Sequence, residues 1–438
     1  MRYVSTDGLN TCDLREAVCR CYAPGRHLYL PSPLPVIPQA FINNICDMSL
    51  TEIAYVVMSA FLADTTPGDV LKEVVEDSFN FDIPLRRPGD GPHVLELFGG
   101  PTLAFKDISA RFMARYMLTM PQRPANRQVM LVATTGNTGS AMARAFADLA
   151  DISLVILYPR GAMTTEELFR YAGHPGNVQA IEVSGSIADC KRLVREAVTA
   201  PAPMPGLTLL CGNTQNIMRL LPQVVYFFHA YARLKADGVA GDGFTLAVPC
   251  GNLSNLTSAV MARRMGLPAG CIVGGCATND TLVRVLDGSL DPGLAGSHTA
   301  HSLARAMNTG YPTNLPRLLA LSGGIESARL SGLKAVAVGD DTIAATIRDV
   351  YARTCYLLDP HTAVAYAAAR QCAPTGTPAV VLATAHPAKE SRAMRDITGA
   401  TPALPAGIRL RDDIPRVRAE RIPPTLTALR KSLARICS

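Results

Sequence analysis

Residues 99–109 read GGPTLAFKDIS, and they place one lysine, Lys106, between a glycine–proline turn and an apolar patch. A lysine that serves only solubility usually lies among other charges, whereas Lys106 follows Leu103, Ala104 and Phe105. Two interpretations follow. One is a surface lysine whose stem covers apolar neighbours. The other is a reactive amine, because partial desolvation favours the neutral form that attacks a carbonyl group.

The composition indicates a large folded protein. Of 438 residues, 48% are hydrophobic and 18% are charged, which suffices for one large core or two linked ones. No apolar run approaches the roughly 20 residues of a membrane span, and the first residues lack the apolar region of a signal peptide. We therefore expect a cytoplasmic protein with no membrane partner and with most of its twelve cysteines as buried, reduced thiols.

Neither a metal nor a nucleic acid is expected as a partner. No C-x-x-C pair occurs, and Cys19 and Cys21 have no matching Cys or His at a zinc-site spacing. The last 38 residues hold eight Lys or Arg against three Asp or Glu and so supply +5 of the formal charge of +6. However, prolines interrupt any long basic helix there, and no aromatic residue is present for base stacking. A solvated surface is the better interpretation of this tail.

A pattern of strand, glycine turn and helix recurs after residue 93. Short apolar strands are predicted over residues 128–133, 152–158, 244–248 and 379–383. Helices are predicted after residue 139 with an apolar face reaching Leu149, over 187–198, and up to Gly266. This alternation is typical of α/β layers around mainly parallel sheets. We predict a mostly helical N-terminal segment (1–92), a large domain (93–125 and 206–438) and a small α/β domain (126–205).

Two glycine–asparagine loops each follow a predicted strand and open a predicted helix: TTGNTG at 134–139 and CGNLSN at 250–255. The free N–H groups and the positive dipole end of a helix start form an anion site. Either loop alone could equally be an ordinary tight turn. The chain lacks G-x-x-x-x-G-K-[ST] and G-x-G-x-x-G, which argues against a P-loop and a dinucleotide site. Pyridoxal phosphate, by contrast, needs both a lysine for its aldehyde and a backbone cradle for its phosphate.

Seven segments together resemble threonine synthase, a pyridoxal-phosphate-dependent family of fold type II. They are GGPTLAFKD, ATTGNTG, VILYPRG, CGNTQNIMRLL, VPCGNLSN, DPHTAVAY and TAHPAKE, and the match runs in order over roughly residues 1–400. The resemblance implies a tryptophan synthase β-like architecture of two α/β domains with the cofactor between them. It also implies conversion of O-phospho-L-homoserine and water to L-threonine and phosphate by β,γ-elimination and replacement.

The same resemblance gives roles to matching positions. Lys106 would form the Schiff base with the cofactor and carry protons, Asn137 would bond the cofactor's phenolic oxygen, and Thr384 would face its ring nitrogen. The cofactor phosphate would lie in the loop made by Gly251, Asn252, Leu253, Ser254 and Asn255. The substrate's carboxylate and phosphate would be held by Thr134, Thr135, Thr138, Asn213, Thr214 and Arg219. For Arg219, an ion pair with a carboxylate on a helix surface is the alternative.

Several positions depart from the family pattern. Asp7 stands where the N-terminal S-T-R-G has arginine, residues 162–167 look shortened, and Ser254 occupies a cradle position where glycine is common. These changes affect the substrate side more than the cofactor chemistry. Two alternatives therefore stay open: a paralogue acting on another phosphorylated or γ-substituted amino acid in a specialised pathway, and a catalytically silent, pyridoxal-phosphate-binding regulatory protein. A small phosphorylated amino acid is the expected partner of a monomer or homodimer.

Overall fold

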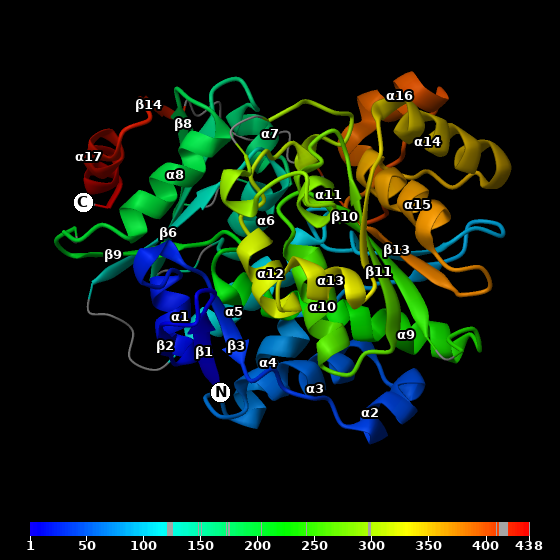
Figure 1. Cartoon of the computed structure of the whole chain (residues 1–438). Coiled ribbons are helices and arrows are strands. Elements are labelled where there is room, and N and C mark those ends of the chain that lie inside the picture. Colours follow the sequence, from blue (N-terminus) through cyan, green and yellow to red (C-terminus); the bar gives the residue numbers. More distant parts are fainter. Residues whose placement is uncertain are drawn as a thin grey trace.

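The computed structural model describes residues 1–438 except 121–125, 148, 150, 172, 174–175, 203, 242, 297–298, 409, 411–418 and 438. Two mainly parallel sheets with helices packed around them form its body, and the N-terminal elements lie along one side (Figure 1). This is the predicted α/β class with mainly parallel sheets. No helix in the described part of the chain is long and apolar enough to span a bilayer.

The N-terminal segment is mainly helical, as predicted, and also contains a small antiparallel sheet of order β2-β1-β3 that the prediction omitted. Its strands have only two to four residues, too few for a period-2 pattern to stand out. Its elements are β1 (Arg2–Ser5), β2 (Thr11–Cys12), α1 (Leu14–Arg20), β3 (Tyr29–Ser32), α2 (Gln39–Asn44), α3 (Leu50–Leu62) and α4 (Gly68–Ser78).

The larger sheet has the order β12-β11-β10-β13-β5-β4 and is parallel except for β4. Its strands are β4 (Leu85–Arg86), β5 (His93–Glu96), β10 (Phe244–Cys250), β11 (Ala269–Cys276), β12 (Leu333–Ala337) and β13 (Ala379–Ala383). The strands predicted at 244–248 and 379–383 are confirmed as β10 and β13. Because β13 lies between β10 and β5, the loops after these three strands meet at one edge of the sheet. That edge is where open α/β sheets bind their ligands.

The helices around this sheet pack on it directly or through other helices. They are α5 (Lys106–Thr119), α9 (Val225–Ala236), α10 (Ser254–Arg264), α11 (Thr281–Leu286), α12 (Leu315–Ser322), α13 (Ile325–Leu330), α14 (Asp340–Thr354), α15 (Pro360–Cys372) and α16 (Ser391–Thr398). The helix predicted to end at Gly266 is α10, which ends two residues earlier.

The smaller sheet is parallel throughout, in the order β14-β8-β7-β6-β9. Its elements are β6 (Arg127–Ala133), α6 (Asn137–Ala145), β7 (Ile152–Pro159), α7 (Thr165–Phe169), β8 (Val178–Val183), α8 (Ile187–Val198), β9 (Leu207–Cys211) and β14 (Glu420–Ile422). The predicted helix 187–198 is confirmed as α8. Helix α6 ends at Ala145, so Leu149 lies beyond it, contrary to the prediction. Strands β9 and β14 lie outside residues 126–205, the range predicted for the small domain.

The C-terminal strand β14 and the helix after it belong to the smaller sheet and its surroundings. Helix α17 (Leu426–Cys437) lies beside α8, on the opposite side of Figure 1 from α16. The apolar residues Leu429 and Leu433 of α17 belong to the same buried cluster as Leu193 and Val194 of α8. Part of the basic tail discussed above, residues 411–418, lies outside the described residues.

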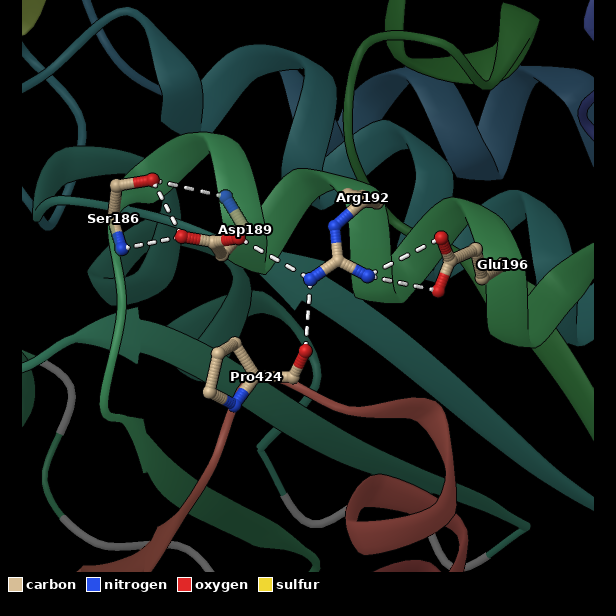
Figure 2. Close-up of polar contacts among 5 residues, drawn as sticks. All are labelled: Ser186, Asp189, Arg192, Glu196 and Pro424. Carbon is tan, nitrogen blue, oxygen red and sulfur yellow. Dashed lines mark hydrogen bonds and ion pairs between the residues drawn. The ribbon is translucent and has the colours of Figure 1, made fainter.

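A polar cluster at the start of α8 holds the C-terminal segment in place (Figure 2). Ser186 and Asp189 form a capping box, in which the Ser186 hydroxyl accepts from the Asp189 N–H at 3.2 Å and the Asp189 carboxylate accepts from the Ser186 N–H at 2.9 Å. Arg192 donates to Asp189 at 3.2 Å, to Glu196 at 3.1 Å and to the carbonyl of Pro424 at 2.8 Å. One arginine therefore connects α8 to the chain between β14 and α17.

Candidate active site

The turn that precedes Lys106 is tied to the first turn of α5. The buried carboxylate of Asp107 accepts hydrogen bonds from the Thr102 N–H at 2.8 Å and the Thr102 hydroxyl at 2.7 Å. A Cβ on Gly100 would lie only 2.6 Å from Asp107 Oδ2, so this position has room only for glycine. Leu103 adopts a left-handed φ of 58°. The packed turn thus holds Lys106 at the first position of α5.

The loop after β13 lies against this turn. The Phe105 N–H donates to the carbonyl of Thr384, and the His386 N–H donates to the carbonyl of Leu103, both at 3.0 Å. These bonds form a short antiparallel bridge between the two loops. The buried Thr384 is therefore placed beside the residue that precedes Lys106.

Lys389 also connects the loop after β13 to the turn before α5. It was not singled out as a site residue from the sequence. Its ammonium donates to the carbonyl of Thr102 at 2.8 Å and lies 4.0 Å from the centre of the Tyr171 ring. Burial lowers its pKa to about 8, although Asp107 acts in the opposite direction. Lys389 thus links the loop after β13 to the turn before α5 and to the loop after α7.

The Lys106 amine lies in an environment that favours its neutral form. Its Nζ is 4.1 Å from the centre of the Phe105 ring, and the side chain is half-buried. Burial, with smaller contributions from the positive charges of Arg219 and Lys191, lowers the pKa of Lys106 to about 7. These are the surroundings expected of a reactive amine, and they differ from those of a surface lysine.

In the loop between β6 and α6, one threonine side chain bonds to the loop's own backbone, and the other polar side chains could bond to a ligand. The Thr134 hydroxyl accepts from the N–H groups of Gly136 at 2.9 Å and Gly139 at 3.1 Å. Within the described part of the chain, the side chains of Thr135, Asn137 and Thr138 have no hydrogen-bond partner. Thr135 is exposed, whereas Asn137 and Thr138 are half-buried at the start of α6. The loop therefore has polar groups to offer a ligand.

Asn213 connects this loop to the segment after β9. Its amide donates to the Ala133 carbonyl and accepts from the Ala133 N–H, both at 2.8 Å. The pair of bonds keeps the register of β6 and β9 two residues beyond their last strand pair, Leu131 and Cys211. These bonds hold Ala133 in place, and with it the start of the loop at Thr134. The second N–H of the Asn213 amide remains available for a ligand.

Arg219 is fully buried and lies beside α5 and α6. Its Nε donates to the Ser109 hydroxyl at 3.1 Å, and its Nη1 donates to the Gly212 carbonyl at 2.8 Å and contacts the sulfur of Met142. Its Nη2 has no partner. Among the described residues it has no ion pair, so the alternative of a carboxylate partner on a helix surface is not what the structure contains. A buried guanidinium with a free donor and no counter-charge is suited to an anion.

The second glycine–asparagine loop packs tightly before α10. A Cβ on Gly251 would lie 3.0 Å from the carbonyl oxygen of Ala306 and 3.1 Å from Cα of Met307. Leu253, at the N-cap of α10, takes a left-handed φ of 61°. Ser254, which stands where glycine is common in the family, has an ordinary helical backbone and needs no positive φ. No side chain caps this helix start. Ser254 and Asn255 are buried, and Asn255 accepts from the Tyr226 hydroxyl.

The loops thus form one connected group. Thr384 contacts the Lys106 segment, Arg219 contacts α5, and Asn252 donates to the Thr214 hydroxyl at 2.9 Å. The loop that carries Thr135, Asn137 and Thr138 is connected to this group by the bonds between Asn213 and Ala133. The side chains of these three residues make no bond to the group among the described residues.

Comparisons with known proteins agree over nearly the whole chain. Family models match residues 94–385 (pyridoxal-phosphate dependent enzyme), 2–79 (threonine synthase N terminus) and 362–431 (threonine synthase, C-terminal). A threonine synthase of Escherichia coli is 34% identical over 420 residues, which is 95% of both chains. The chain belongs to the threonine synthase family. The resemblance in the motifs is thereby confirmed.

Solved structures of threonine synthases have the same fold. That of the Escherichia coli enzyme superposes with a TM-score of 0.89 at 31% sequence identity, covering 99% of this chain and 100% of the other. A pyridoxal-phosphate-bound threonine synthase from Brucella melitensis gives a TM-score of 0.87 at 29% identity, covering 100% and 99%. The fold type II architecture is therefore also confirmed.

The residues of the site fit pyridoxal phosphate, the cofactor of this family. Lys106 provides an amine of lowered pKa, and the uncapped start of α10 provides free N–H groups beside the cradle at Gly251. The structure also shows two groups in this network that the sequence analysis missed, Asn314 and the fully buried Arg317. Nothing in the motif TNLPR distinguishes them from a solvent-exposed helix start.

The pH at which Lys106 reacts provides a first prediction. The rate at which added pyridoxal phosphate attaches to the cofactor-free protein should rise with pH and level off above about pH 7, since the neutral amine is the nucleophile and its pKa is about 7. At pH 5 the rate should be about 100-fold below the plateau. The measurement is stopped-flow visible absorbance. A rate that keeps rising towards pH 10, the behaviour of an ordinary lysine, would contradict the lowered pKa.

The packing around Gly251 provides a second prediction. Gly251→Ala should raise the dissociation constant of pyridoxal phosphate about tenfold and cost about 1 kcal/mol of stability, because the new methyl group crowds the Ala306 carbonyl. The matched control is Gly270→Ala, where an added Cβ meets nothing within 4 Å. Equilibrium titration of both variants checks this, and equal affinities would show that Gly251 has no part in the cradle.

Proposed function

We propose that this chain converts O-phospho-L-homoserine and water into L-threonine and inorganic phosphate. Arg219 is the observation that carries the proposal for this particular chain. Its free Nη2 lies in a buried site without an acidic partner among the described residues, and its charge acts on the pKa of Lys106. A lysine that moves protons and an anion-binding arginine close to it suit a substrate that carries both an α-proton and a phosphate.

The residues would divide the work as follows. When bound, pyridoxal phosphate supplies an electron sink for negative charge at the substrate's α-carbon. Lys106, whose pKa of about 7 leaves a large neutral fraction at pH 7, would take the α-proton and return it. Arg219 and Thr214 would hold the substrate phosphate as it leaves with all four of its oxygen atoms. The β-carbon loses one proton as the bond between the γ-carbon and the phosphate oxygen breaks, the γ-carbon then receives a proton and becomes the methyl group, and water gives its hydroxide part to the β-carbon. The proton lost from the β-carbon and the one left over from water balance those gained by the γ-carbon and by the released phosphate.

The buried setting serves this chemistry in a second way. Arg219 is fully buried, and Thr214, Thr134 and Thr384 are nearly so, which excludes bulk water from the reacting centre. Electrostatic interactions with the leaving phosphate are then stronger than in solvent. Asn213 keeps the loop at Thr134 in register.

The departure at Asp7 is accommodated within the N-terminal segment. Its carboxylate accepts from the Ser5 hydroxyl and, at 3.2 Å, from the Leu9 N–H, and it lies 3.3 Å from the His27 ring. The negative charge is thus satisfied locally. The substitution at this position therefore needs no partner outside the N-terminal segment.

For the domain division, we propose an N-terminal segment of residues 1–92 and a small domain made of the sheet β14-β8-β7-β6-β9 with its helices. Strands β9 and β14 would then move with that domain, and the large domain would contain the other sheet. We also propose a cytoplasmic location and a monomer or homodimer, to be tested by fractionation and size-exclusion chromatography with light scattering.

Analysis of all products tests the proposed reaction. The purified protein with bound cofactor is incubated with O-phospho-L-homoserine, and phosphate and amino acids are measured together. Equal amounts of phosphate and threonine are expected. Phosphate with 2-oxobutyrate would show elimination without controlled water addition. No turnover with cofactor bound would favour the paralogue or the silent regulatory protein.

A further inference from the structure

The Thr214 hydroxyl lies between two asparagine side chains from different parts of the chain. Thr214 follows β9 and is 6% exposed. Its Oγ1 is 2.9 Å from Nδ2 of Asn252, in the loop before α10, and 3.0 Å from Nδ2 of Asn314, at the start of α12. What the hydroxyl can do for a ligand depends on which end of each amide faces it.

Both amides are oriented by partners that can only donate. Oδ1 of Asn252 accepts from the backbone N–H of Thr313 at 2.8 Å, and a backbone N–H has no lone pair to offer. Oδ1 of Asn314 accepts from Nη1 of Arg317 at 3.0 Å, and a guanidinium likewise never accepts. Each amide must therefore turn its nitrogen towards Thr214.

The orientation of the two amides determines whether the Thr214 hydroxyl donates or accepts its third hydrogen bond. A hydroxyl has two lone pairs and one proton. Asn252 and Asn314 both donate to Thr214, so its two lone pairs are occupied. No acceptor for the Thr214 proton occurs among the residues that the structure describes. The hydroxyl is left with one function, which is to donate.

Arg317 holds the whole arrangement. It is fully buried, and besides Asn314 it donates to three carbonyls: that of Thr214 at 2.7 Å, of Gln215 at 2.6 Å and of Tyr29 at 2.9 Å. It therefore fixes both the amide that faces Thr214 and the backbone that carries Thr214. Three separate parts of the chain, at β3, after β9 and at α12, meet on this one side chain.

We propose that Asn314 and Arg317 are positioning residues that make the Thr214 hydroxyl an obligatory hydrogen-bond donor to a phosphate group. This inference rests on the proposed function and adds to it two residues that do not themselves touch the ligand. The phosphate is the substrate's or, because Asn252 belongs to the loop of residues 251–255, the cofactor's. Both sources share the same chemistry, a dianion that accepts a hydrogen bond from an oriented donor.

A double-mutant cycle between Thr214 and Asn314 tests the proposal. Thr214→Val removes the hydroxyl at nearly constant volume and should raise KM for O-phospho-L-homoserine about 10- to 100-fold. Asn314→Asp keeps the shape but replaces the donor with an acceptor, so that Thr214 can turn its proton towards residue 314. A similar rise in KM is expected. The double variant should be no worse than Thr214→Val, since the proton that Asn314 directs is already gone.

Two further variants separate positioning from general damage. Thr214→Ser, which keeps the hydroxyl, should restore KM to within a few-fold of the parent protein. Asn80→Asp is the matched control, because Oδ1 of Asn80 also accepts from an arginine, Arg111, at 2.7 Å, but on the protein surface. It should leave KM unchanged. Effects of Thr214→Val and Asn314→Asp that multiply in the double variant would overturn the proposal.

Two more readouts identify the phosphate and keep the test independent of turnover. A rise in the dissociation constant of pyridoxal phosphate in Thr214→Val, with KM unchanged, would assign the donor to the cofactor; the reverse would assign it to the substrate. If the parent protein makes no threonine, inorganic phosphate is titrated into the cofactor-loaded protein and followed by visible absorbance. Weaker phosphate binding in Thr214→Val would still support the oriented donor. No change in KM, cofactor affinity or phosphate binding would refute it.

Discussion

Replacement of Lys106 by alanine is expected to lower kcat/KM for threonine formation by about 10⁴-fold or more. The side chain is proposed both to attach the cofactor and to carry the α-proton, so both functions are lost together. The half-buried amine, with its pKa of about 7, has no substitute at the start of α5. Steady-state kinetics and the visible spectrum of the purified variant measure the two losses separately.

Lys389→Ala is the matched control for this experiment. Lys389 is also half-buried, with a pKa lowered to about 8, and it donates to Thr102 in the turn before Lys106. This variant should keep the absorbance of covalently attached cofactor even where its stability falls. A Lys106→Ala protein that keeps both this absorbance and its activity would rule out Lys106 as the cofactor lysine.

Replacement of Arg219 by methionine is expected to raise KM for O-phospho-L-homoserine by about 10²-fold or more, because a desolvated charge pair with the substrate phosphate is lost. Arg219→Lys should recover only part of this, since a lysine keeps the charge but loses the planar fork of donors. The folded protein should tolerate the methionine, because the buried guanidinium bonds only to neutral groups in the described structure.

A second arginine provides the control for Arg219. Arg233 on α9 donates to the carbonyls of Cys46 and Met48, at 3.1 and 3.2 Å, and lies outside the proposed site. Arg233→Met should change the melting temperature but not KM. An unchanged KM in Arg219→Met would remove Arg219 from the substrate site.

The sequence predicted those parts of the fold and site that depend on local patterns. Strands β10 and β13 and helix α8 follow from apolar runs and periodicity, and Lys106 stands out because of its apolar neighbours. The motifs around it identified the family. These features are carried by residues close together in the chain.

The features that could not be predicted depend on distant contacts. Strand β14 has three residues and pairs with β8, more than 230 residues earlier, so no local pattern reveals it. Buried Arg317 bonds to the carbonyls of Tyr29 and Thr214, which lie 288 and 103 residues away in the sequence. The donor role inferred for Thr214 depends on the orientation of two amides, which is a property of the assembled structure.

The most direct test of the central claim follows the oxygen of water through the reaction. The cofactor-loaded protein is incubated with O-phospho-L-homoserine in water enriched in oxygen-18, and both products are analysed by mass spectrometry. The proposed reaction breaks the bond between carbon and oxygen, so threonine should carry one heavy oxygen and the phosphate none. Heavy oxygen in the phosphate, with homoserine as the other product, would mean simple hydrolysis of the phosphate ester and would contradict the account.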